Sequence, residues 1–126
     1  MLAMAPHSKN AMIWGTFELE PEVTRWLEGL SDEDFGPAAF YVDLLEREGV
    51  HLGEPYTRQL RGKLRELRFY LGRERMRVGY FVASGRRIIL LTVFRKTKQR
   101  EEAEIDRAKA AMSRCIAEEP TAQEDS

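Results

Sequence analysis

The chain has few of the residues from which covalent cross-links and metal sites are built. Cys115 is the single cysteine among 126 residues, so no intramolecular disulfide and no cysteine-based zinc site can form. His7 and His51 are the only histidines and lie far apart in the sequence, which argues against a histidine-rich metal site or a histidine acid–base pair. We therefore expect no metal and no other cofactor.

Long apolar runs are also missing. No stretch approaches the ~20 apolar residues that a membrane-spanning helix needs. Residues 1–11 contain one lysine, Lys9, and no apolar segment of the length found in secretory signals. The simplest interpretation is a cytoplasmic protein, in a reducing compartment and without a membrane partner.

Charge is present in quantity but is unevenly distributed, although the formal net charge is only −1. Residues 58–100 contain 14 basic and 2 acidic side chains, whereas residues 1–57 and 101–126 contain 11 and 8 acidic side chains. A basic block of this density is typical of a polyanion-binding site. Charge alone does not separate RNA, DNA and an acidic protein as partners, and the acidic flanks could also shield the block within the chain.

The apolar pattern predicts a single α+β domain over residues 12–117, in the order β-α-α-β-β-β-α. We expect a small antiparallel sheet with helices packed on one face, a flexible leader at residues 1–11 and a flexible acidic tail at residues 118–126. The expected elements are a strand at 13–18, a helix at 21–30, a helix between Ser31 and Gly49, strands at 64–71, 76–83 and 88–94, and a last helix that contains residues 105–116.

Two details of this pattern are specific. Ser31 is a plausible N-cap, because three acidic residues follow it in the first helical turn, and Gly49 suits the end of the same helix. Residues 50–57 contain Gly53 and Pro55 and are expected to form a loop. The continuous apolar run at 88–94 predicts a central strand that is buried on both faces.

Arginines alternate with large apolar residues on the expected strands. Arg68 and Arg77 fall on neighbouring strands, and Arg95 and Lys96 fall at the end of the third. Such positions can converge on one open sheet face, where guanidinium groups offer bidentate contacts to phosphate. Tyrosines in or beside the same stretch, which could stack on an unpaired base, are Tyr56, Tyr70 and Tyr80. The alternative is that each strand arginine merely keeps an exposed face solvated. This explanation is less convincing for a whole block of basic residues than for one arginine.

The chemistry that these residues could perform is limited. The sequence has no nucleophile elbow, no Walker loop and no HExxH motif. Glu66 and Glu74 are the only acidic residues of the basic block, which argues against a two-metal nuclease. If RNA is cut, its own 2′-hydroxyl should attack the adjacent phosphate, with basic side chains as the clamp and with Glu66, a tyrosine or a lysine transferring protons.

Residues 60–69 (LRGKLRELRF), 76–81 (MRVGYF) and 89–97 (ILLTVFRKT), followed by Glu104-Ile105-Asp106-Arg107-Ala108, resemble the HigB branch of the RelE/ParE toxin superfamily. The resemblance covers about residues 12–117 and implies a RelE-like fold. It further implies the toxin of a bacterial type II toxin–antitoxin system, which cleaves mRNA on the translating ribosome without a metal. The partner it implies is an antitoxin that is usually a helix-turn-helix DNA-binding protein.

By position, the resemblance implies that Arg68, Arg77 and Lys96 are catalytic. Further RNA contacts are expected from Arg61, Lys63, Arg65, Tyr80, Arg95 and Lys98. Glu66 is a candidate general base, but related toxins often carry lysines there and a late tyrosine that residues 100–103 lack, so the base stays open. Two alternatives remain: a ParE-like protein that inhibits DNA gyrase, and an inactive member that still binds its antitoxin.

Overall fold

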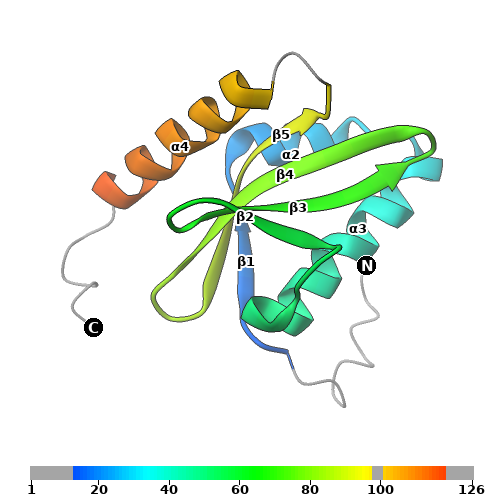
Figure 1. Cartoon of the computed structure of the whole chain (residues 1–126). Helices are drawn as coiled ribbons and strands as arrows, with labels where there is room; N and C mark the ends of the chain where they lie inside the picture. Colours follow the sequence, from blue (N-terminus) through cyan, green and yellow to red (C-terminus); the bar gives the residue numbers. More distant parts are fainter. Residues whose placement is uncertain (1–12, 98–100, 119–126) are drawn as a thin grey trace.

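A computed structural model of the chain describes residues 13–97 and 101–118 (Figure 1). The expected leader at 1–11, and the expected tail except for residue 118, lie outside the described residues. The elements are β1 (Thr16–Leu19), α2 (Pro21–Glu28), α3 (Asp32–Glu48), the 3-10 helix η2 (Gly49–His51), β2 (Thr57–Arg61), β3 (Leu64–Leu71), β4 (Glu74–Ala83), β5 (Arg87–Arg95) and α4 (Glu101–Glu118).

The strands form one five-stranded sheet in the order β1-β5-β4-β3-β2. β1 joins the sheet by pairing with β5 in parallel, while the other neighbouring strands are antiparallel. The predicted α+β class is therefore confirmed. Two details differ from the expected antiparallel sheet: β1 and β5 form a parallel pair, and the sheet contains an additional strand, β2.

β2 occupies the edge of the sheet, where a strand needs little apolar character. Its sequence, TRQLR, has Leu60 as its only large apolar residue, so no alternating pattern marks it. Its ladder with β3 shifts register between Gln59 and Arg61, and Gly62 closes the following turn with a φ of 56°. The strand forms because β3 offers a free edge, which local sequence alone does not report.

α3 begins and ends as the sequence predicts. The hydroxyl oxygen of Ser31 accepts a hydrogen bond from the backbone N–H of Asp34 at 3.1 Å, which caps the helix. Gly49 ends it with a φ of 54°, and a Cβ atom there would lie 2.1 Å from the Trp14 ring. Glycine is thus required twice over, by the backbone conformation and by the ring packed against it.

The helices cover both faces of the sheet, not one face as expected. α2 and α3 pack on one face, while Ala108 and Met112 of α4 pack on the opposite face. Gly79 lets α4 approach closely, because a Cβ atom there would lie 3.2 Å from that of Ala108. β5 is accordingly buried on both faces, as predicted, with Leu90 in one cluster and Leu91 in the other.

α4 covers only part of its face. The strand residues beneath it include Leu64 at the start of β3 and Phe81 in the second half of β4. Figure 1 shows that α4 runs away from the tip of the β3–β4 hairpin, and that no other helix of the described residues covers the hairpin on that side. The second half of β3 and the first half of β4 therefore present a helix-free surface, which positions the site described below.

Glu22 connects α2 to the two elements beside it. Its carboxylate accepts hydrogen bonds from the Arg107 guanidinium of α4 at 2.6 and 3.0 Å and from the Val93 N–H of β5 at 3.0 Å. Burial raises the pKa of Glu22, but the hydrogen bonds from Arg107 and Val93 and the nearby positive charges lower it more, so that the pKa lies below the usual 4.5.

We predict that Glu22→Gln lowers the free energy of unfolding by about 1 kcal/mol at neutral pH, because the network is partly exposed. A carboxylate with a lowered pKa stabilises the fold above its unfolded pKa, and that contribution is lost as the pH falls through the folded value. The deficit should therefore shrink below about pH 4.5 in thermal unfolding scans. The exposed Glu28→Gln is the control, and a deficit independent of pH would contradict the prediction.

Candidate functional site

Two arginines on adjacent strands converge on a buried carboxylate. Arg68 of β3 and Arg77 of β4 are directly opposite each other in the ladder, and Glu66 shares their face. The Glu66 Oε2 atom lies 3.2 Å from Arg77 Nε and 3.6 Å from Arg68 Nε. The predicted meeting of the two arginines is confirmed. The predicted open position of Arg77 is wrong, because that residue is only 4% exposed and Glu66 is 0% exposed.

The charges of this cluster hold one another in place. Burial raises the pKa of Glu66 despite the opposing effect of Arg77 and Arg68, and burial lowers the pKa of Arg77 despite Glu66. Neither carboxylate oxygen of Glu66 and neither arginine Nε atom has a hydrogen-bond partner among the described residues. The groups are thus electrostatically paired, with hydrogen-bonding capacity left unused.

A pocket of about 300 Å³ opens beside the cluster, at the edge of β3. It lies at the end of the β2–β3 pairing, where the backbone N–H of Arg68 donates a hydrogen bond to the carbonyl oxygen of Tyr56 at 2.8 Å. The residues that line it are Tyr41, Pro55, Tyr56, Arg68, Phe69, Tyr70, Arg75 and Arg77. Tyr70 and Arg75 are directly opposite each other, as are Arg68 and Arg77, so that three arginines and a tyrosine form one block on the helix-free surface.

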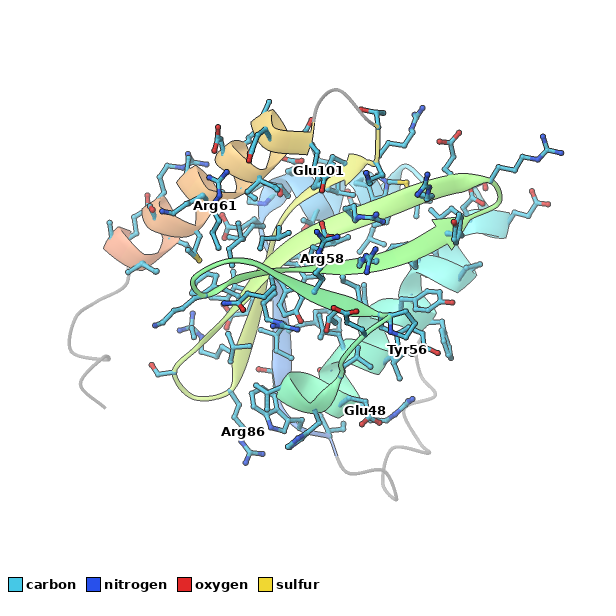
Figure 2. All side chains as sticks on the ribbon, viewed as in Figure 1. Glu48, Tyr56, Arg58, Arg61, Arg86 and Glu101 are labelled. Atoms are coloured by element: carbon cyan, nitrogen blue, oxygen red, sulfur yellow. The ribbon has the colours of Figure 1, made fainter. Side chains whose placement is uncertain are left out.

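Further charged residues border this block. Lys96 donates a hydrogen bond to the Glu101 carboxylate at 2.9 Å, and this bond is the main cause that lowers the pKa of Glu101. Arg58 of β2 is exposed, is opposite Glu66 in the ladder and acts electrostatically on both Glu66 and Glu101. Figure 2 shows Arg58 between Glu101 and Tyr56. Lys96 thus lies near the cluster but does not line the pocket.

Two residues expected to contact RNA lie on the other face of the sheet. Arg65 donates hydrogen bonds to the Tyr80 hydroxyl at 3.3 Å and to the Thr57 hydroxyl at 3.0 Å. Tyr80 is 2% exposed and belongs to the core beneath α2 and α3, and burial raises its pKa. Tyr80 is therefore a core residue and not the base-stacking residue that the sequence suggested.

The remaining basic residues that the sequence nominated lie outside the pocket. Arg61 pairs with Glu102 and Asp106 of α4, each at 2.8 Å. Arg95 pairs with Glu74 at 3.1 Å. Lys63 is exposed in the turn between β2 and β3, and Lys98 lies outside the described residues.

Sequence reasoning left Arg58, Arg75 and Glu101 out of the site. Arg75 could have been found, because a tight turn at Gly72 and Arg73 fixes the register that places Arg75 opposite Tyr70. Arg58 lies on the strand that the sequence did not predict, and no local pattern indicates that the first turn of α4 returns to the cluster.

Among residues 13–97 and 101–118, no group of three or more histidine, cysteine, aspartate and glutamate side chains is placed to hold a metal ion. The same part of the chain contains no helix with the length and apolar character required to cross a membrane.

A family model described as phage derived protein Gp49-like (DUF891) matches residues 25–113, which is more than half of the chain. The chain therefore belongs to the Gp49-like family, and this family is related to the RelE/HigB-like toxin superfamily. The match spans every residue that lines the pocket. No curated protein sequence matches the chain.

We predict that Arg77→Ala destabilises the protein by about 3–5 kcal/mol, because it leaves Glu66 buried without its nearest cation. The double variant Glu66→Leu/Arg77→Met, which replaces both charges with apolar groups of similar size, should recover most of that loss. Urea unfolding followed by circular dichroism measures both.

Arg75→Ala is the matched control, since Arg75 lines the same pocket but is exposed. Its free energy of unfolding should stay within about 0.5 kcal/mol of the wild type. An Arg77→Ala variant as stable as Arg75→Ala would show that the pair does not support the fold.

Proposed function

We propose that this protein is the toxin of a bacterial type II toxin–antitoxin system and that it cleaves mRNA on the ribosome. The observation that carries the proposal is the pocket in which Arg68, Arg75 and Arg77 face tyrosines beside the buried Glu66. Membership of a family related to RelE/HigB-like toxins supports the toxin class. The grouping of planar cations with aromatic rings favours RNA as the target.

In the proposed reaction the 2′-oxygen of the RNA bonds to the adjacent phosphorus, and the bond from phosphorus to the 5′-oxygen breaks. The products are a 2′,3′-cyclic phosphate and a free 5′-hydroxyl. Arg68 and Arg77 supply fixed positive charge for the pentacoordinate phosphorane, which is more negative than the ground state. Because the two guanidinium groups are already aligned by Glu66, they need little reorganisation when that charge develops.

The proton transfers require other groups. Glu66 is fully buried and does not line the pocket, so it serves as a positioning residue and not as the general base. Arginine stays protonated in proteins, which leaves the tyrosine hydroxyls as the proton-exchanging groups among the residues that line the pocket. Tyr70 is the most exposed of them at 61%, and Lys96 is a further candidate at the border.

Within the superfamily we propose the HigB branch, because the segments that resemble it form most of β3, β4 and β5. β3 and β4 carry the arginine cluster, and Lys96 directly follows β5. The partner that this assignment implies is an antitoxin with a helix-turn-helix DNA-binding fold. Exposed basic residues around the pocket offer contacts to ribosomal RNA; they include Arg58, Arg73 and Arg95.

We predict that expression without the antitoxin stops growth by stopping translation. Pulse labelling should show that protein synthesis falls before DNA synthesis, and primer extension should map new mRNA ends that carry 5′-hydroxyl groups. Arg68→Ala should lower the cleavage rate by about 10²–10³, as expected for the loss of one donor to the transition state.

The control is Arg86→Ala, because Arg86 is exposed at the far end of β4, where it lies over the Trp14 ring. This variant should remain fully toxic. Arrest of DNA synthesis before protein synthesis would replace the proposal by gyrase inhibition, and a folded protein without any effect on growth would identify an inactive family member.

A further inference from the structure

The pocket combines an arginine block with an exposed aromatic wall. Tyr70 is 61% exposed and Tyr56 is 40% exposed, so both rings are accessible to a ligand. Both line the pocket together with Arg68 and Arg75. An exposed ring beside a guanidinium group offers a stacking surface and a phosphate contact to the same ligand.

Other rings support Tyr56 from beneath. The Tyr41 ring of α3 stacks on Phe69 of β3 with centroids 5.1 Å apart and an interplanar angle of 11°. Tyr56 lies against the same Tyr41 ring with centroids 6.3 Å apart. Figure 2 shows Tyr56 at the beginning of β2, beside α3. Tyr56 is therefore supported by the core and does not have to be ordered by its ligand.

The charges of the pocket select the ligand further. Its lining contains three arginines and no carboxylate, because Glu66 is enclosed behind them. The volume of about 300 Å³ is at the small end of the range for ligand sites and suits one flat ring with one anionic group. A double helix cannot present such a ring, because its bases are stacked on one another.

We infer that the pocket holds one unpaired nucleotide of a single-stranded RNA, with its base against Tyr70 and Tyr56 and its phosphate on Arg68 and Arg75. The inference rests on the proposed function for its substrate class and adds the subsite that selects unpaired over paired RNA. Tyr80, the other tyrosine of the basic block, takes no part because it is buried on the opposite face.

The test is binding of a short, fluorescently labelled RNA whose 2′-oxygens are methylated, so that attack by the 2′-oxygen is blocked. Fluorescence anisotropy with the full chain should show tighter binding of the single strand than of its duplex. Tyr70→Ala should weaken binding of the single strand about 5- to 150-fold, the range expected for the loss of one stacked base. Tyr70→Phe keeps the ring and should bind like the wild type.

The matched control is Phe35→Ala, because Phe35 is 42% exposed but does not line the pocket. This variant should bind like the wild type. A second series of RNA probes each lacks the base at one position. For one of these probes the affinity of the wild type should fall as much as it does when Tyr70→Ala binds the complete RNA. Tyr70→Ala should bind that probe and the complete RNA with equal affinity. Unchanged affinity of Tyr70→Ala, equal affinity for the duplex or no wild-type binding of the single strand would each overturn the inference.

Cleavage of unmodified mRNA in a translation extract is measured separately. Selective binding of the single strand by a protein that cuts no message would refute the proposed function and leave the nucleotide subsite standing. Cleavage by the wild type, together with unchanged binding by Tyr70→Ala, would leave the function standing and refute the subsite.

Discussion

The carboxylate of Glu66 keeps two arginines of neighbouring strands side by side. Arg68 and Arg77 occupy directly opposite positions of the β3–β4 ladder, where like charges repel each other. The hairpin can keep this register because the negative charge of Glu66 offsets the repulsion. Its Oε2 atom lies 3.2 Å from Arg77 Nε and 3.6 Å from Arg68 Nε.

Gly79 marks the line at which apolar packing gives way to this charged cluster. It is directly opposite Glu66 in the ladder, and α4 comes so close to it that a Cβ atom there would lie 3.2 Å from that of Ala108. A side chain at this position would require Thr92 or Ala108 to shift by a few tenths of an ångström. Glu66, on the strand beside this close contact, is fully buried, and that burial raises its pKa.

Much of the fold could be predicted because periodicity and capping are local. Ser31 and the run at 88–94 were sufficient to place α3 and the central strand. The double burial of that strand already required helices on both faces, which a one-sided arrangement could not provide. In the site, the burial of Tyr80 could have been predicted, because alternation puts Tyr80 in the same row as Met76 and Val78. The burial of Arg77 depends on Glu66 and could not be deduced from alternation alone.

The acidic flanks explain how a chain with a net charge of −1 can present a strongly basic pocket. Flanking acids pair with basic residues outside the pocket lining, in the pairs Arg61–Glu102, Arg61–Asp106, Arg87–Glu18 and Lys96–Glu101. These pairs neutralise several basic residues around the pocket, while Glu66, which pairs with Arg68 and Arg77, is fully buried. The pocket lining keeps three arginines and no carboxylate, and this local positive charge favours a polyanion there although the net charge of the chain is close to zero.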